Sequence, residues 1–234
     1  FHTTVEGFPV IHAKADQGGD DEARFQDSVG DDSFVGGPTE STLSGNGFEN
    51  SAELFETVHV TSSHGSDTAE LVDSDGHDVF TGSPTRSTLE GDGYTIQLDG
   101  FAEVEAESTD GDYDVAALSG SAGADHLVAD DTSAELSGAG YSVRAKLFEE
   151  AYADAGQGDD TFEIADSAGD DYLWAQDYWG QIGWPTGSTG RTLQFSNFES
   201  GTAVSSHGGT DFAHNPGPAE VDYALTLEGD WVDW

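Results

Sequence analysis

The chain has 234 residues, of which 47 are acidic and only 6 are basic, so its formal net charge is −41. This charge excludes nucleic acid and anionic membrane surfaces as partners, because both are bound through Lys and Arg. The 31 glycines and the absence of Cys and Met are typical of a β-rich protein without disulfide bonds. No stretch of sequence reaches the roughly 18 apolar residues of a membrane span, so we do not expect membrane insertion.

In chain order, the first predicted element is a partial coil over residues 1–24. Four copies of one unit follow, near residues 25–70, 71–117, 118–163 and 164–214. Each copy contains a turn of the form Ser-x-Gly-x-Asp-x-apolar, and the turn aspartates are Asp32, Asp78, Asp125 and Asp171, which are 46, 47 and 46 residues apart. A period of this length indicates a stack of supersecondary units that share one core.

A second class of Gly-containing turns lies 11 residues before the first class. Its aspartates are Asp21, Asp67, Asp114, Asp160 and Asp211. The interval of 11 residues between the two classes leaves room for one short strand and a turn.

Apolar residues keep the same register as the turns. The repeated sets are Phe25, Leu71, Leu118 and Ile164; Phe34, Phe80, Leu127 and Leu173; Leu43, Leu89, Leu136 and Ile182; and Phe8, Phe55, Phe101, Phe148 and Phe198. Segment 103–107 alternates acidic and apolar residues, as a strand with one solvated face does. We therefore predict an all-β fold, a parallel β-helix-like β-solenoid of about five coils, in which equivalent side chains of consecutive copies lie directly over one another.

We interpret glycines such as Gly45, Gly47, Gly91 and Gly93 as corners of the coil. The alternative architecture is a β-sandwich or a chain of small antiparallel modules.

The Gly-x-Asp-x-apolar turns, such as Gly30-Asp31-Asp32-Ser33-Phe34, resemble part of the calcium-binding nonapeptide of repeats-in-toxin proteins, although the nine-residue period is missing. That resemblance implies calcium held between successive turns by Asp carboxylates and turn carbonyls. More broadly, the Asp-Ser-x-Gly-x-Asp-x-Phe phrase resembles the repeat regions of large secreted acidic surface proteins of marine and saline bacteria. This second resemblance implies an extracellular structural role.

The candidate metal ligands are the aspartates of both turn classes, and calcium is the candidate cofactor. They are Asp21, Asp32, Asp67, Asp78, Asp114, Asp125, Asp160, Asp171 and Asp211. Stacked carboxylates about 4.8 Å apart repel each other by roughly 1 kcal/mol even in water, which favours a bound cation or a saline medium. The alternative is that each Asp accepts a hydrogen bond from its own turn, as Asp does beside Gly in many tight turns.

The C-terminal part of the sequence differs from the rest. We predict a cap or subunit-contact segment over residues 215–234, after a solenoid that occupies residues 1–214. All five tryptophans lie in the last 61 residues. With one tyrosine they form a candidate interface or glycan-binding set: Trp174, Tyr178, Trp179, Trp184, Trp231 and Trp234.

These patterns favour an extracellular or cell-surface structural protein that associates head to tail into a homopolymeric fibre, is adapted to salt and is stabilised by calcium. An extracellular polysaccharide is a further candidate partner. Two alternatives are a carbohydrate-binding adhesin module and a β-helix polysaccharide lyase. We do not expect an enzyme, because a lyase needs a basic residue against the uronate and only Arg86, Arg144, Arg191 and two lysines are candidates.

Overall fold

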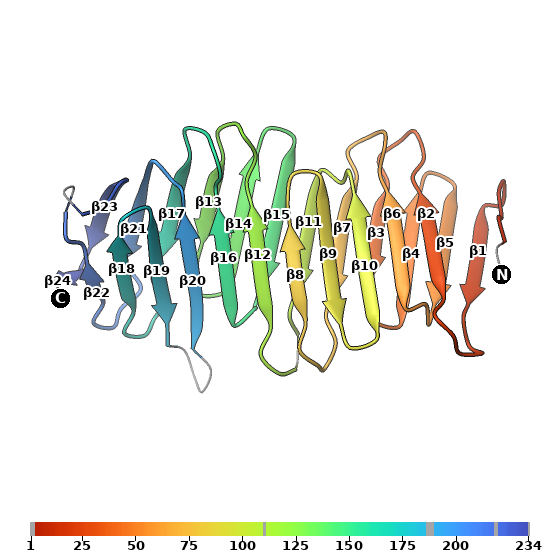
Figure 1. Cartoon of the computed structure of the whole chain (residues 1–234), viewed down its shortest axis with the longest axis horizontal. Helices are drawn as coiled ribbons and strands as arrows, with labels where there is room; N and C mark the ends of the chain where they lie inside the picture. The colour runs from red at the N-terminus through yellow and green to blue at the C-terminus, as the bar shows by residue number, and fades with distance from the viewer. Residues whose placement is uncertain (1–2, 110, 186–189, 218–219, 234) are drawn as a thin grey trace.

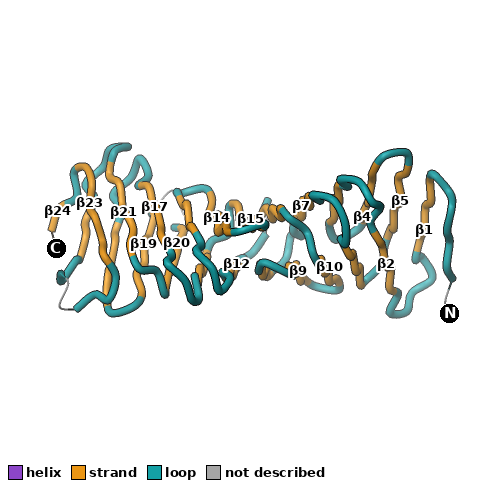
Figure 2. Tube along the Cα trace, turned by 90° about the horizontal axis from the view of Figure 1, so that it is seen from above, coloured by secondary structure: helices purple, strands orange, loops and turns teal. Residues whose placement is uncertain are grey.

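A computed structural model describes residues 3–109, 111–185, 190–217 and 220–233. Every regular element in these residues is a β-strand, and the strands form two sheets of twelve. Figure 1 shows an elongated body with the two termini at opposite ends, and Figure 2 shows the strands following one another along its long axis. The all-β solenoid that the repeat predicts is confirmed.

The described residues contain no helix of the length and apolarity needed to cross a membrane.

Neighbouring strands in each sheet are hydrogen-bonded in the following order. Sheet A contains β1 (Val10–Lys14), β5 (Phe48–Glu53), β4 (Glu40–Gly45), β3 (Ser33–Gly36), β7 (Thr68–Val72), β11 (Glu103–Glu107), β15 (Tyr141–Lys146), β14 (Ser133–Gly138), β13 (His126–Ala129), β17 (Thr161–Ala165), β21 (Ser200–Ser205) and β23 (Ala224–Gly229). Sheet B contains β2 (Glu22–Gln26), β6 (Thr57–Thr61), β10 (Tyr94–Asp99), β9 (Arg86–Gly91), β8 (Val79–Gly82), β12 (Val115–Ser119), β16 (Glu150–Asp154), β20 (Arg191–Ser196), β19 (Trp179–Trp184), β18 (Tyr172–Gln176), β22 (Phe212–His214) and β24 (Val232–Asp233).

Each copy of the repeat consists of one antiparallel meander and two single strands. The meanders are β3–β5, β8–β10, β13–β15 and β18–β20, and they lie alternately in sheets A and B. The single strands that follow each meander pair in parallel, as β7 does with β11 and β11 with β15. One copy therefore places its meander in one sheet, its next strand in the opposite sheet and its last strand in the first sheet again. The next copy begins in the opposite sheet, so one copy makes one and a half turns. The solenoid has about six turns, close to the predicted five coils.

This path corrects the prediction that equivalent side chains stack on one another. Because a copy ends half a turn out of phase, Phe34 lies in sheet A and Phe80 in sheet B. In its own sheet Phe34 pairs with Leu43 across the meander and with Ala69 on the other side. Each inward column therefore combines side chains from different positions of the repeat.

The core is nevertheless continuous, as predicted. Phe34, Phe80, Leu127 and Leu173 are all at most 1% exposed and belong to one hydrophobic cluster. Alternation of buried and exposed residues along the strands places this cluster between the sheets. Phe8 is an exception, because it is 62% exposed and lies outside the core.

The paired glycines have two roles, neither of which is a corner between the sheets. Gly45 and Gly91 lie against the carboxylates of Asp32 and Asp78. Gly47 and Gly93 adopt positive φ angles of 88° and 79° in the hairpins between the second and third meander strands. Asn46-Gly47 and Asp92-Gly93 are typical hairpin dipeptides, so the antiparallel meanders had a sequence signal that the solenoid interpretation did not use.

Candidate metal centre

The structure brings the two classes of turn aspartate together in pairs 35 to 40 residues apart. In each pair the backbone N–H of the first aspartate donates a hydrogen bond to Oδ1 of the second, with N–O distances of 2.7 to 3.0 Å. The pairs are Asp32 with Asp67, Asp78 with Asp114, Asp125 with Asp160, and Asp171 with Asp211. Each bond joins the turn of one strand to the turn of the neighbouring strand.

The first aspartate of each pair also closes its own turn. Oδ2 of Asp78 accepts hydrogen bonds from the backbone N–H and the hydroxyl of Ser74, at 2.9 and 2.8 Å. Asp32, Asp125 and Asp171 accept the same backbone bond from a serine four residues earlier. The alternative that these aspartates accept hydrogen bonds from their own turns is therefore confirmed, and it is compatible with a metal site because a carboxylate oxygen has two lone pairs.

A glycine makes room for three of these inward-pointing carboxylates, those of Asp32, Asp78 and Asp125. A Cβ at Gly91 would overlap Oδ1 of Asp78, and one at Gly138 would overlap Oδ1 of Asp125. The hydroxyl of a neighbouring tyrosine completes the shell in two copies: Tyr94 donates to Asp78 at 2.7 Å and Tyr141 to Asp125 at 2.8 Å.

A third aspartate, which the sequence analysis missed, joins three of the four pairs. It lies five residues before the first aspartate. The resulting groups are the first turn cluster (Asp27, Asp32, Asp67), the second turn cluster (Asp73, Asp78, Asp114) and the fourth turn cluster (Asp166, Asp171, Asp211), and in each group one ligand oxygen per residue lies within 4.8 Å of the others. The Asp-x4-Asp spacing recurs in the sequence and was the available signal. It indicates a metal site only together with the aspartate that the next turn contributes.

All members of the clusters are buried except the half-buried Asp27, and two clusters contain carboxylate oxygens without a protein partner. All three members of the second cluster are at most 5% exposed. Oδ2 of Asp73 is buried and accepts no hydrogen bond. Oδ2 of Asp67 in the first cluster is also buried and accepts none. An unpaired buried carboxylate oxygen is costly, so these atoms fit a site for a cation.

Burial and mutual repulsion also act on the pKa values in the clusters. Burial, followed by the nearby Asp73 and Glu149 carboxylates, raises the pKa of Asp114 despite its hydrogen bonds from Asp78 and Ser108. Burial and the charges of Asp211 and Asp166 likewise raise the pKa of Asp171. The negative charge of these groups is thus incompletely compensated by the protein.

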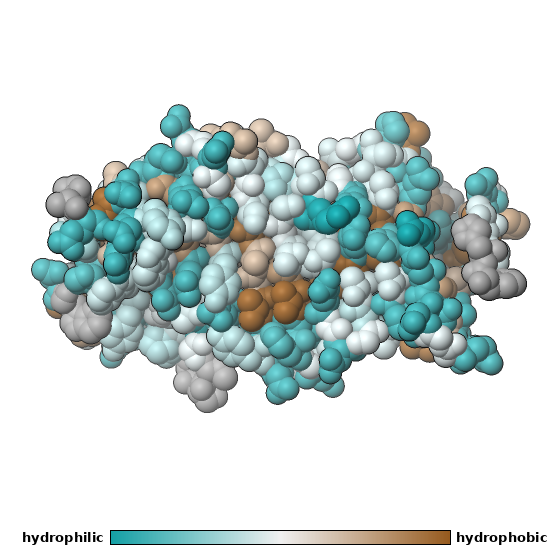
Figure 3. Space-filling model, in the orientation of Figure 1, coloured by the Kyte–Doolittle hydropathy of each residue, from teal (hydrophilic) through white to brown (hydrophobic). Residues whose placement is uncertain are grey.

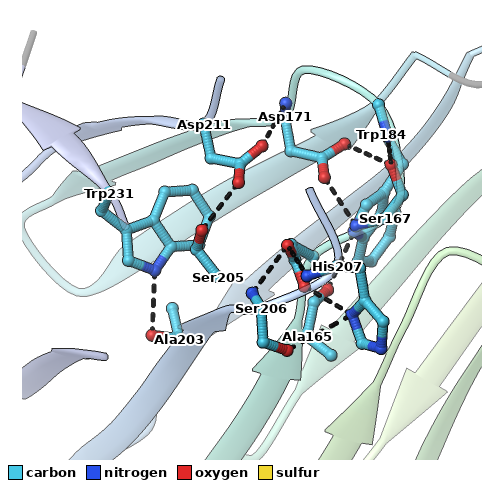
Figure 4. A network of polar contacts seen from close by, with 12 residues as sticks. Ala165, Ser167, Asp171, Trp184, Ala203, Ser205, Ser206, His207, Asp211 and Trp231 are labelled. Atoms are coloured by element: carbon cyan, nitrogen blue, oxygen red, sulfur yellow. Dashed lines mark hydrogen bonds and ion pairs between the residues drawn. The ribbon is translucent and has the colours of Figure 1, made fainter. Parts of the chain in front are cut away.

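The fourth turn cluster adds a histidine on its outer side (Figure 4). His207 Nδ1 lies 2.6 Å from Oδ1 of Asp166, and the backbone N–H groups of Ser206 and His207 donate to Oδ2 of Asp166. The hydrogen bond with Asp166, followed by its charge, raises the pKa of His207. On the inner side the Ser205 hydroxyl donates to Oδ2 of Asp211 at 2.7 Å.

The remaining predicted metal ligands are not in three-carboxylate groups within the described residues. Asp125 and Asp160 form a pair, here called the third turn pair, because Gly120 occupies the position that Asp73 has in the second cluster. Oδ2 of Asp160 is buried without a partner there. Asp21 lies beside Glu56, whose carboxylate accepts a hydrogen bond from the Asp21 backbone.

Oxygen ligands without nitrogen or sulfur are the donor set of hard cations such as calcium and magnesium. Each cluster supplies up to six carboxylate oxygens from two consecutive turns. A cation held there would connect neighbouring strands and neutralise the buried charge.

The predicted aromatic set is divided by the structure. Trp174 and Trp179 lie on the outer face of sheet B, and Tyr178, 56% exposed, lies in the turn between β18 and β19. Trp184 is a core residue with 3% exposure whose Nε1 donates to the Ala165 carbonyl, which corrects its placement in an exposed cluster. Trp231 packs against the core and donates to the Ala203 carbonyl (Figure 4), and Trp234 lies outside the described residues.

All six basic residues of the chain have acidic or carbonyl partners. Lys14 pairs with Glu53, Arg24 with Glu22, Arg86 with Asp99, and Arg144 and Lys146 with Glu105, while Arg191 donates to the carbonyls of Phe148 and Asp131.

Neither a protein-family model, nor a curated protein, nor a solved structure matches this chain. The functional argument therefore depends on the turn clusters and on the surface of the solenoid.

Proposed function

We propose that the chain is a structural β-solenoid, extracellular and adapted to salt, whose turns are held together by calcium. The observation that carries this proposal is the set of three aspartate clusters, whose members are buried except for the half-buried Asp27, and two of which contain orphan carboxylate oxygens. A cation in such a cluster binds the folded chain only, because the second turn cluster draws Asp73 and Asp78 from one turn and Asp114 from the next. Binding to the folded state alone stabilises it by mass action.

Calcium suits these clusters better than magnesium. Calcium accepts six to eight oxygens in flexible geometry, whereas magnesium requires a near-ideal octahedron and retains its waters. The turn carboxylates are fixed by backbone bonds and surrounded by serine hydroxyls, so the cluster offers many oxygens in an irregular arrangement.

A saline extracellular setting is supported by the distribution of charge. On β11, Glu103, Glu105 and Glu107 occupy the outer face of sheet A. On the opposite side, that of sheet B, hydrophilic colours cover most of the face seen in Figure 3. Such a surface repels itself at low ionic strength and is relieved at high ionic strength, where the screening length falls to about 3 Å at 1 M salt.

Head-to-tail association is the second part of the proposal. The last strands of the two sheets are β1 and β2 at one end and β23 and β24 at the other. A second copy would continue both sheets with the same parallel pairing that already joins β7, β11 and β15.

A non-catalytic role is supported by the basic residues. A polysaccharide lyase needs a free cation to neutralise the uronate carboxylate, whereas the candidates Arg86 and Arg144 are paired with Asp99 and Glu105.

The calcium proposal is tested by calorimetric titration and by thermal unfolding at fixed ionic strength. We expect about three calcium ions per chain, one for each three-carboxylate cluster, and a melting temperature that rises with calcium and falls with chelator. Magnesium and additional sodium at the same ionic strength are the controls and should give a smaller rise. Equal melting temperatures with calcium and with chelator would contradict the proposal.

The fibre proposal is tested separately by electron microscopy and sedimentation over a range of protein concentration in high salt with calcium. We expect filaments or a concentration-dependent increase in mass. Monodisperse single chains under all these conditions would exclude head-to-tail association and leave the calcium sites unaffected.

A further inference from the structure

One part of the outer surface lacks the acidic character of the rest. On β18, β19, β20 and β22 the outward positions alternate with buried ones, and none of the eleven outward residues is Asp, Glu, Lys or Arg. They are Tyr172, Trp174, Gln176, Trp179, Gln181, Gly183, Thr192, Gln194, Ser196, Phe212 and His214. We call this surface the aromatic platform.

The preceding meander of sheet B shows that the fold does not require such a surface. In β8–β10 the outward positions include Arg86, Glu90 and Asp99, and Arg86 forms an ion pair with Asp99 at 2.7 Å. In the platform the same cross-strand position is occupied by Trp179 and Ser196. A charged pair in one meander is thus replaced by an indole and a hydroxyl in the other.

The strand register aligns aromatic and amide side chains in a single row. Neighbouring strands place Tyr152, Gln194, Gln181, Trp174 and His214 side by side. Five strands span four spacings, or about 19 Å, which is long enough to contact several sugar rings. The row ends at β16, where Glu150 and Asp154 restore the acidic surface.

Ring stacking holds the aromatic side chains in place before any ligand binds. The Trp174 and His214 rings stack with centroids 4.1 Å apart, and the Tyr172 and Phe212 rings stack at 5.5 Å. Trp174 remains 37% exposed and Tyr172 46% exposed. Because these side chains are already ordered, little conformational entropy would be lost on binding.

We propose that the aromatic platform binds a neutral polysaccharide. Indole and phenol rings present flat apolar surfaces to the C–H faces of sugars, and the Gln181 and Gln194 amides can both donate to and accept from sugar hydroxyls. The ligand is neutral because the platform contains no Lys or Arg to bind an anionic sugar and the surrounding acidic surface repels one. This inference does not depend on the calcium sites or on fibre formation.

Affinity gel electrophoresis of the folded chain tests the inference, with hydroxyethyl cellulose, galactomannan and xyloglucan as neutral probes and alginate as the anionic probe. We expect retardation by at least one neutral probe and none by alginate. Trp174→Ala, and separately the double variant Trp179→Arg with Ser196→Asp, should weaken binding at least tenfold. The double variant recreates the charged pair of β9 and β10 in a site of the same backbone, so it is expected to fold, and melting temperature checks this for both variants.

Tyr113→Ala is the matched control, because Tyr113 is a 51% exposed aromatic residue outside the platform. It should leave binding unchanged. The inference is overturned if no neutral probe retards the wild-type chain, if alginate retards it equally, or if folded platform variants bind as the wild type does.

Discussion

The second turn cluster and the third turn pair share the same aspartate-to-aspartate contact and differ at three side chains. Asp73, Ser108 and Thr109 of the second cluster are replaced by Gly120, Ala155 and Gly156 in the third copy. The backbone N–H of Asp73 and that of Gly120 both donate to a carbonyl of the next turn, at 3.3 and 2.7 Å.

The bonds within the two aspartate pairs are also nearly the same. Asp78 N–H donates to Asp114, and Asp125 N–H donates to Asp160, both at 2.7 Å. The fold therefore needs the pair and not the third carboxylate. Oδ1 of the third carboxylate, Asp73, accepts hydrogen bonds from the backbone N–H and the hydroxyl of Thr109, whereas its Oδ2 has no partner. The joint replacement of Asp73, Ser108 and Thr109 in the third copy agrees with the proposal that these groups serve one cation site.

The largest expected effect on stability comes from removing the first aspartate of the pair, which the second turn cluster and the third turn pair both contain. Asp78→Ala and Asp125→Ala should each lower the free energy of unfolding by about 3–5 kcal/mol in chelator, because a serine N–H and a tyrosine hydroxyl lose their acceptor and a cavity is left. Urea unfolding measures both. A much smaller loss for Asp125→Ala would show that the third pair is not equivalent structurally.

The glycines beside these carboxylates should also behave alike in the two sites. Gly91→Ala and Gly138→Ala should each cost about 3 kcal/mol, because the new Cβ overlaps the aspartate. Gly93→Ala is the control: its φ is +79° and nothing lies within 4 Å of the added Cβ, so only backbone strain of about 1 kcal/mol is expected. Equal melting temperatures for Gly91→Ala and Gly93→Ala would contradict the packing argument.

Asp73→Asn removes the charge of the third carboxylate, which the second turn cluster has and the third turn pair lacks. This variant should bind one calcium fewer and lose the stabilisation from that site, about 2.7 kcal/mol at calcium 100-fold above the dissociation constant, which corresponds to about 5–10 °C in melting temperature. In chelator it should be as stable as the wild type or more so. Asp75→Asn removes the same charge two residues away at an exposed position and should leave the calcium response unchanged.

The smallest expected effect is a gain of stability in the third turn pair. Burial, and then the charges of Glu199 and Asp125, raises the pKa of Asp160 in the folded chain. A raised folded-state pKa means that this group favours folding only while it is protonated, and this contribution is lost as the pH rises through the raised value. Asp160→Asn should therefore stabilise the chelated protein by about 1 kcal/mol near pH 7 and by much less near pH 4. Urea unfolding at the two pH values checks this, and a variant less stable than the wild type at pH 7 would refute it.

Much of the architecture could be predicted from local patterns. The inward positions follow from the alternation of apolar residues, and the turns follow from Gly and Asp, because both depend on side-chain direction and backbone freedom within a few residues. The pairing of the two turn classes could not be predicted in the same way. Asp32 and Asp67 meet across 35 residues of chain, and that contact depends on which strands are neighbours.

The sequence by itself determined the β-solenoid, the length of its repeat and the single continuous core, because periodic apolar residues and turn glycines act locally. Only the tertiary structure decided that one repeat makes one and a half turns, since a hairpin and a corner between sheets use similar Gly-rich turns. That half turn puts equivalent residues in opposite sheets, so each aspartate meets a different member of the repeat and not its own copy. The ion-binding geometry proposed here is a consequence of this offset.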